Sequence, residues 1–310
     1  MTWLADRNAN AGRMSAPVSR PEVRLEWSID PETPAPVHDA RLARSSDQSL
    51  PIASDSPLLV ADAVTRDYGD QRGCFDVSLA VWPGEVIAIV GESGSGKSTF
   101  IMSLAGLLRP DRGSVRFSRA PGDTLDLYAV PERTRRAIMR TELGFVHQNP
   151  RDGLRQNVSA GANIAERLMA QGLRHFGRIR DEASAWLRKV EIDATRIDDL
   201  PATYSGGMQQ RLQIARNLVT HPKLMYMDEP TAGLDVSVQA RILDLLRRLC
   251  REFGLAVVVV THDLAVARVL AHRTLVMQRG SVVEAGLTDR ILEDPQHPYT
   301  QLLVSSQLQV

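Results

Sequence analysis

An α/β fold with a mostly parallel central sheet is predicted by three features of the sequence. Residues 224–227 and 255–260 are continuously apolar, which is typical of strands that a parallel sheet buries on both faces. A glycine-rich loop stands between an apolar strand, residues 86–90, and the helix-compatible residues 100–108. Between residues 157 and 200, apolar side chains recur at helical spacing throughout. This last segment predicts a wholly helical subdomain inserted into the α/β domain.

The remaining elements are predicted in order along the chain. Residues 58–64 and 75–81 predict short strands, with turn-forming residues at 68–73 and 82–84. Residues 238–253 predict a crossover helix between the two apolar strands. Its apolar stripe consists of Ile242, Leu245, Leu246 and Leu249. Its outer side carries Arg247, Arg248 and Arg251. In the helical insert the apolar residues at helical spacing are Ile164, Leu168, Met169, Trp186, Leu187 and Val190.

The two ends of the chain differ from the rest. Residues 1–56 contain six of the 17 prolines and no sustained apolar period, so we expect a flexible N-terminal extension. An arm that becomes ordered on a partner is the alternative. We place the folded domain at residues 57–300, with the helical subdomain at about 150–215, and a C-terminal tail at 301–310.

The charge balance and the cysteine content disfavour several classes of function. With 37 basic and 37 acidic residues, the chain has no net charge to attract it to nucleic acid or to an anionic membrane. No apolar stretch approaches the roughly 20 residues of a membrane-spanning helix. Cys74 and Cys250 form neither a disulfide framework nor a CxxC pair, and no secretory signal is recognisable. We therefore expect a soluble, cytoplasmic protein that reaches membranes only through partners.

The glycine-rich loop has the pattern of a phosphate-binding loop. Residues 91–99 read Gly-Glu-Ser-Gly-Ser-Gly-Lys-Ser-Thr, which matches G-x-x-x-x-G-K-[ST] between a strand and a helix. Inward-pointing N–H groups and the following helix N-terminus can hold a polyphosphate. Lys97 can reach the β and γ oxygens, and the Ser98 hydroxyl can bind Mg²⁺. We assign nucleotide binding to Gly91, Ser93, Gly94, Gly96, Lys97, Ser98 and Thr99.

Acidic residues and a histidine follow two of the predicted strands. Asp228 and Glu229 come directly after residues 224–227, and His262 follows residues 255–260. Ligands of an open parallel sheet bind at the carboxyl ends of its strands, so these side chains are expected beside the phosphate loop. Asp228 suits a Mg²⁺ ligand, and Glu229 suits activation of the water that attacks the γ-phosphate. His262 suits holding that water and Glu229 in place.

A resemblance to ATP-binding cassette (ABC) proteins rests on residues 203–211. Their sequence, Thr-Tyr-Ser-Gly-Gly-Met-Gln-Gln-Arg, resembles the signature motif of that family. The phosphate loop, the glutamine-loop residue Gln148, the signature, the acids, Asp235 and the switch residue His262 then stand in family order. The resemblance implies a P-loop NTPase fold of the ABC type, with an antiparallel β subdomain beside the parallel sheet. Tyr68 resembles the family's adenine-stacking residue, and a core tyrosine is the alternative.

The resemblance also implies a mechanism that needs two protomers. Two ATP molecules with Mg²⁺ would be sandwiched in a homodimer, or in a heterodimer with a related ABC subunit, and their hydrolysis would let the halves separate. Gln148 would contact Mg²⁺ or water, and Asp235 would communicate across the dimer. The residues that would reach the γ-phosphate of the second protomer are Ser205, Gly206, Gly207 and Gln209.

Finer resemblances point to two branches of the family. The common signature is L-S-G-G-Q, whereas Tyr204 and Met208 stand at its first and fifth positions here. The signature and residues 297–303, His-Pro-Tyr-Thr-Gln-Leu-Leu, resemble the branch that powers oligopeptide and nickel import. Residues 144–170 and 196–201 instead closely resemble the ABC subunit of carbon–phosphorus lyase systems, which break down phosphonates.

Three functions are compatible with these motifs. The preferred one is the ATPase subunit of a carbon–phosphorus lyase complex, because residues 152–155 read Asp-Gly-Leu-Arg where importer subunits usually carry Ser-Leu-Asn-Pro. The alternative is the energy subunit of a membrane importer for peptides, nickel or phosphonate. A protein that uses ATP only as a structural clamp would not need Lys97, Glu229 and His262 together. Bond cleavage itself would belong to partners, since two cysteines cannot hold an iron–sulfur cluster.

Overall fold

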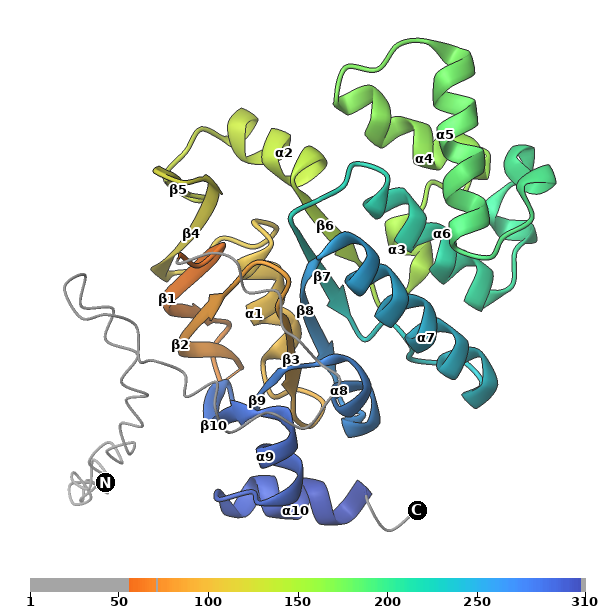
Figure 1. Cartoon of the computed structure of the whole chain (residues 1–310). Helices are drawn as coiled ribbons and strands as arrows, with labels where there is room; N and C mark the ends of the chain where they lie inside the picture. The colour runs from red at the N-terminus through yellow and green to blue at the C-terminus, as the bar shows by residue number, and fades with distance from the viewer. Residues whose placement is uncertain (1–55, 71, 308–310) are drawn as a thin grey trace, which may run out of the picture. The chain divides into compact units, whose positions relative to one another are not determined.

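A six-stranded sheet lies at the centre of the described residues, 56–70 and 72–307, of the computed structural model (Figure 1). Its strand order is β10-β9-β3-β8-β7-β6, and every pairing from β9 to β6 is parallel. The parallel sheet predicted from the apolar runs is therefore confirmed. The strands are β3 (Val86–Val90), β6 (Leu143–Val146), β7 (Leu224–Asp228), β8 (Ala256–Thr261), β9 (Arg273–Gln278) and β10 (Ser281–Leu287).

A separate antiparallel sheet has the order β2-β1-β4-β5, as the ABC resemblance implies. Its strands are β1 (Leu59–Asp67), β2 (Gly73–Val81), β4 (Arg112–Ala120) and β5 (Asp123–Asp126). The sequence predicts β1 and β2 but neither β4 nor β5. In β4 only Val115 and Phe117 are buried, so its apolar pattern is too short to identify a strand.

The central sheet separates two apolar cores, and the alternation along β3 shows how. Val86, Ala88 and Val90 pack into one core with the helical insert and α7 (Val236–Phe253). Ile87 and Ile89 point to the opposite face, into the core shared with α1 (Lys97–Leu104) and the antiparallel sheet. Because all five residues of β3 are buried, the strand that leads into the phosphate loop is held on both sides.

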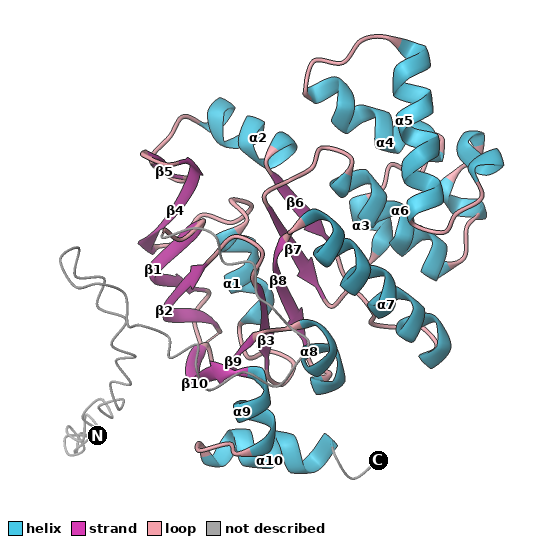
Figure 2. Ribbon diagram, viewed as in Figure 1, coloured by secondary structure: helices cyan, strands magenta, loops and turns pink. Residues whose placement is uncertain are grey.

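Helices cover the parallel sheet and form the insert, which comprises α3 (Pro150–Gly153), α4 (Ala160–Ala170), α5 (Phe176–Lys189) and α6 (Gly206–Leu218) (Figure 2). Outside the insert lie α2 (Glu132–Thr141), α8 (Leu264–Leu270), α9 (Thr288–Glu293) and α10 (Pro298–Gln307). No helix within the described ranges is both long enough and apolar enough to cross a membrane.

The helical insert departs in detail from the sequence prediction. Residues 157–200 are not wholly helical, because turns separate α4 from α5 and end α5. Gly172 and Glu191 have positive φ angles of 96° and 59°, which no α-helix accommodates. Met169, grouped with the apolar stripe above, is 44% exposed, whereas the other five stripe residues of the insert are buried.

The C-terminal boundary also differs from the one expected at residue 300. Helix α10 passes through that position and continues to Gln307, because Tyr299, Leu303 and Val304 form an apolar stripe that packs into the core. The expected N-terminal extension lies outside the described residues except for Ser56, and so do residues 308–310 of the expected tail.

The buried stripe of α7 provides a test of the fold. Leu246 is 1% exposed, so Leu246→Ala should lower the free energy of unfolding by about 2–5 kcal/mol. The neighbouring Arg247 is exposed, and Arg247→Ala should change it by no more than about 0.5 kcal/mol. Urea unfolding of both variants measures the difference. Equal effects would contradict the assigned orientation of α7.

Candidate nucleotide-binding site

The phosphate loop joins the carboxyl end of β3 to α1 and lies directly against neighbouring backbone. At Gly96, where φ is 97°, a Cβ atom would stand 2.1 Å from the carbonyl oxygen of Gly73. At Gly91, a Cβ atom would stand 2.2 Å from the carbonyl oxygen of Met277. Only glycine fits at both positions. Strands β2 and β9 therefore determine the shape of the loop, while Ser93 and Gly94 at its tip are exposed.

Lys97 is buried beneath the loop and bonds to the loop's own backbone. Its Nζ donates to the carbonyl oxygens of Gly91 at 2.8 Å and Glu92 at 2.7 Å. Burial lowers the pKa of this ammonium, and the charges of Glu229 and Asp228 partly oppose that shift. A buried cation whose donors can turn from carbonyls to phosphate oxygens suits a polyphosphate ligand.

Ser98 and Asp228 meet across the edge of the sheet. The Ser98 hydroxyl donates to Asp228 Oδ1 at 3.0 Å. Adjacent ligands of an octahedral Mg²⁺ with bonds of 2.0–2.1 Å lie about 3 Å apart, so the two oxygens already have a suitable separation. Burial raises the pKa of Asp228, and the Ser98 hydrogen bond opposes this shift while the charge of Glu229 adds to it. A cation between the two side chains would compensate the partly buried charge of Asp228.

The three residues expected to be catalytic lie together, because His262 and Gln148 both contact the carboxylate of Glu229. Its Oε2 lies 3.0 Å from Nδ1 of His262 and accepts a 3.4 Å hydrogen bond from Nε2 of Gln148. Glu229 has φ 44°, an uncommon angle for a residue other than glycine, and its N–H donates to Val260 of β8. The backbone therefore turns sharply after β7 and directs this carboxylate toward β8 and the glutamine loop.

The signature residues begin α6. The Ser205 side chain caps this helix by accepting from the N–H of Met208 at 3.3 Å. Gly207 is buried against α7, where a Cβ atom would stand 2.5 Å from Val238. Gln209 is also buried, and its Nε2 donates to the carbonyl of Tyr204. In this conformation Gln209 shapes the signature loop from within, whereas Ser205 and Gly206 are exposed.

The two unusual signature residues share one partner, Arg196. Its guanidinium lies over the ring of Tyr204, 4.5 Å from the centroid, and its Nη1 is 3.6 Å from the sulfur of Met208. The Tyr204 hydroxyl donates to the Arg196 carbonyl at 2.8 Å. The departure from L-S-G-G-Q is therefore a packing adjustment to Arg196, and it leaves the Ser-Gly-Gly segment unchanged.

The other predicted residues lie at the margins of the site. Tyr68 is 46% exposed, with the Arg66 guanidinium 5.1 Å from its ring centroid, so it is a surface residue in this structure. Asp235 precedes α7 and is exposed, and no side-chain cap from it is formed. A cavity of about 360 Å³ opens between the glutamine loop and the signature. Its lining includes Gln148, Gly206, Gln209, Gly233 and Leu234.

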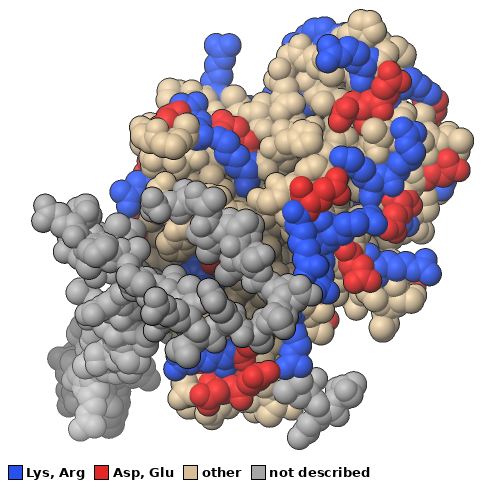
Figure 3. Space-filling view, in the orientation of Figure 1, with Lys and Arg blue, Asp and Glu red and all other residues tan. Residues whose placement is uncertain are grey.

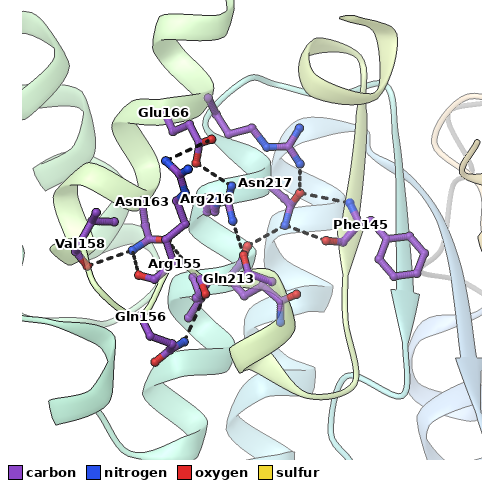
Figure 4. Close-up of polar contacts among 12 residues, drawn as sticks. Phe145, Arg155, Gln156, Val158, Asn163, Glu166, Gln213, Arg216 and Asn217 are labelled. Atoms are coloured by element: carbon purple, nitrogen blue, oxygen red, sulfur yellow. Dashed lines mark hydrogen bonds and ion pairs between the residues drawn. The ribbon is translucent and has the colours of Figure 1, made fainter. Parts of the chain in front are cut away.

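Two residues that sequence reasoning missed connect the glutamine loop to the signature helix (Figure 4). The Asn217 side chain pairs with both backbone groups of Phe145, at 3.1 and 3.0 Å. The Gln213 side chain pairs in the same way with His147, at 2.5 and 3.2 Å. Strand β6, which ends just before Gln148, is thus bonded to α6. The sequence offered one signal for this contact: Gln213 and Asn217 are amide residues four positions apart, so they lie on one face of the helix.

This arrangement defines the class of protein. The site combines a phosphate loop with acidic residues at the edge of a parallel sheet, and the helical insert adds a glycine pair capped by a serine. These features together define an ATP-binding cassette. The ABC transporter family model matches residues 74–232, and the chain belongs to this family. It is an ABC-type ATPase, and such cassettes form dimers.

Individual relatives refine this assignment. The chain is 63% identical to the putative phosphonates utilization ATP-binding protein PhnK of Escherichia coli K12, over 82% of this chain and 99% of that protein. It is 37% identical to the dipeptide transport ATP-binding protein DppD of the same organism, over 80% of this chain and 77% of DppD. The resemblance to phosphonate-related subunits is thereby confirmed.

Solved structures agree with the fold. A dimeric structure of the ATP-binding cassette MJ0796 in a post-hydrolysis state, bound to ADP and Pi, superposes with a TM-score of 0.66 at 30% identity. The match covers 74% of this chain and 98% of that one. A second dimeric structure of MJ0796 has a TM-score of 0.67 at 31% identity, with the same coverage. The P-loop NTPase fold of the ABC type is confirmed.

The raised pKa of Asp228 leads to a stability prediction. The folded protein keeps a proton on this carboxyl up to a higher pH than the unfolded chain does. The free energy of unfolding therefore falls as the pH rises from the pKa of the unfolded chain to that of the folded protein, and it stays lower at neutral pH. Asp228→Asn removes the charge but keeps an acceptor for Ser98. It should raise the Tm of the nucleotide-free protein at neutral pH, by about 2–4 °C for each kcal/mol relieved.

Differential scanning calorimetry across a pH series measures this effect. The gain in Tm should shrink as the pH falls, because the wild-type carboxyl then becomes protonated as well. A Tm below that of the wild type at neutral pH would show that Asp228 stabilises the fold and does not serve mainly as a ligand.

Proposed function

We propose that this chain is the ATP-hydrolysing subunit of a carbon–phosphorus lyase complex for phosphonate catabolism. It forms a dimer around two ATP molecules and drives a conformational change in the enzyme core. The observation that carries the proposal is the 63% identity that extends over 99% of PhnK, against 37% for the dipeptide importer subunit DppD. The cytoplasm is the compartment in which such a complex would meet ATP.

Within one protomer, the phosphate loop and Lys97 bind the β- and γ-phosphates once Lys97 releases the carbonyls of Gly91 and Glu92. Ser98, Asp228 and Gln148 are the residues that would hold Mg²⁺, which neutralises the charge that develops on the phosphates. Thr99 follows at the start of α1, and the exposed ring of Tyr68 is available to stack on adenine.

Glu229 orients and deprotonates the attacking water. The hydrogen-bond partners seen here support that role, since Gln148 and His262 approach the same carboxylate oxygen, Oε2. With that oxygen engaged, Oε1 is the better acceptor for a water proton. His262 thereby acts as the positioning group, and Gln148 links the state of the site to β6 and the helical insert.

The second protomer completes the site. The exposed Ser205 and Gly206 at the N-terminus of α6 offer N–H groups and the positive end of the helix dipole to a γ-phosphate. The exposed Asp235 and its neighbour Val236, 81% exposed, lie at the start of α7 where a second copy can cover them. Gln209 contributes indirectly, through its bond to Tyr204.

A basic cavity is the candidate docking surface for the enzyme core. It has a volume of about 770 Å³ and lies between α2, β6, α4 and α6. Its lining includes the exposed Arg136, Arg140 and Arg174, together with Asp152 and Met169. Arg167 at its wall is partly buried, and this burial lowers its pKa to about 10, which still leaves it charged. The three exposed arginines suit an acidic partner segment.

The cavity is a local feature of the surface. On the face seen in Figure 3, basic and acidic side chains are interspersed over the helical subdomain, so no broad basic field favours nucleic acid.

Asp152 lies at the edge of the cavity, and the neighbouring Arg155 is 3.8 Å from Glu166. These two residues belong to the segment that differs from importer subunits.

The alternative is an importer ATPase, supported by the 37–40% identities to peptide-transport subunits. The same cavity would then receive a cytoplasmic segment of a permease, and the protein would contact the membrane only through that partner. Isolation of the native complex from cells that express Glu229→Gln, in the presence of ATP, separates the two. Phosphonate-degrading enzymes in the soluble fraction support the lyase role, whereas a co-purifying multi-span permease supports import.

Glu229→Gln also tests the assigned chemistry. The variant should bind ATP and accumulate as a dimer, while kcat falls by about 10³-fold because the water is no longer activated. ATP turnover and size-exclusion chromatography with ATP measure the two effects. Turnover at the wild-type rate would remove Glu229 from this role.

The docking surface is tested by the paired substitution of Asp152→Ala and Arg155→Ala. Both residues are exposed, so basal ATPase activity should stay within about twofold, while recovery of the complex should fall by about tenfold if the partner contacts this segment. The matched control is Arg178→Ala with Asp181→Ala, which changes two exposed residues of opposite charge on α5, neither of which lines the cavity. Equal recovery from both double variants would contradict this surface.

A further inference from the structure

The C-terminal helix reaches the phosphate loop. Tyr299 of α10 is 7% exposed, and its hydroxyl oxygen accepts a 3.0 Å hydrogen bond from the N–H of Glu92, the second residue of the loop. The two residues are 207 positions apart in the sequence. None of the roles assigned above to the nucleotide site involves this contact.

The position of Tyr299 is determined by contacts at the start of α10. The carboxylate of Glu284 in β10 accepts hydrogen bonds from the N–H groups of Gln296 at 2.8 Å and His297 at 3.0 Å. Burial opposes ionisation of Glu284, but the nearby Thr300 side chain and the hydrogen bonds from these N–H groups outweigh it and lower its pKa. His297 Nδ1 in turn accepts from the N–H of Tyr299 at 3.2 Å.

The hairpin that carries Glu284 contacts the loop as well. In the turn between β9 and β10, the N–H of Gly280 donates to the carbonyl of Ser95 at 3.0 Å. The C-terminal part of the domain therefore supports the phosphate loop at two points, Ser95 through the hairpin and Glu92 through α10. The first contact uses backbone alone, whereas the second depends on one side chain.

We propose that Tyr299 is a positioning residue for ATP binding, which holds the first turn of the phosphate loop through the N–H of Glu92. The carbonyl of Glu92 is bonded to Lys97 Nζ and to the N–H of Ser95. Lys97 has to leave that carbonyl to reach the phosphates, so the loop loses a support as the nucleotide binds. The Tyr299 contact comes from outside the loop and does not depend on Lys97.

Loss of the hydroxyl should weaken nucleotide binding more than catalysis. Without it the N–H of Glu92 loses its hydrogen bond to α10, and the loop samples more conformations before ATP orders it. A neutral hydrogen bond of ordinary strength corresponds to about a threefold to tenfold change in an equilibrium constant. Once ATP and Mg²⁺ are bound, Glu229 and His262 act as before, so kcat is preserved. The inference rests on ATP binding by the cassette and is independent of the phosphonate partner.

The experiment compares Tyr299→Phe with Tyr128→Phe in the full chain. The hydroxyl of Tyr128 also bonds to backbone, sharing its proton between the carbonyls of Ser103, in the last turn of α1, and Leu108, just after that helix. Tyr299→Phe should raise the Kd for ATP, measured by isothermal titration calorimetry, and the KM by about threefold to tenfold, with kcat within about twofold of the wild type. Tyr128→Phe should lower the Tm of the nucleotide-free protein without changing Kd or KM.

The proposal is overturned if Tyr299→Phe leaves Kd and KM unchanged, or if both variants raise them equally. Should Tyr299→Phe prove poorly folded by calorimetry, Glu284→Gln carries the test, because it keeps the tyrosine and weakens only the anchor of α10. A raised KM with unchanged kcat in that variant supports the proposal, and an unchanged KM overturns it. A wild-type chain that failed to bind ATP would contradict the ATPase assignment instead.

Discussion

The nucleotide site depends on a buried ammonium group held close to carboxylates before any phosphate arrives. Lys97 is only 4% exposed, and its charge is accommodated by loop carbonyls and by the nearby Asp228 and Glu229. Such an arrangement costs stability in the nucleotide-free protein, as the raised pKa of Asp228 indicates. The surrounding structure has to compensate by packing β3 on both faces and by seating the loop against β2 and β9. The packing of the fold thus offsets the cost of keeping Lys97 charged and buried for nucleotide binding.

Much of the core was predictable because its physical signal is local. Strand β3 has the predicted bounds, and β7, β8 and α7 differ from the prediction by one or two residues at their ends. The three strands are buried on both faces and therefore read as continuous apolar runs in the sequence. Helix α7 is buried along one stripe and therefore shows apolar residues at helical spacing. Strands β4, β5 and β10 are only partly buried. Their sequences therefore lack the regular alternation of apolar and polar residues by which a strand is recognised.

The site was predictable to the extent that its motifs are contiguous. Ser98 with Asp228, and Glu229 with His262, come together as expected because parallel strands end at the same edge of the sheet. Contacts between distant segments carry no such signal. The two amides of α6 share one face of the helix, but the partner of Asn217 in β6, like the contact of Tyr299 with Glu92, depends on how helices and strands pack, which no local pattern records.

The amide pairs on α6 have a mechanical consequence. A helix of 13 residues is about 20 Å long and nearly inextensible. Ser205 caps one end of α6, and further along Asn217 bonds to Phe145 of β6 and Gln213 bonds to His147 just after that strand. Any tilt of this rod moves both ends at once. A load applied by a docked partner would therefore shift Ser205 at one end of α6 and, through β6, displace Gln148 in the glutamine loop at the same time.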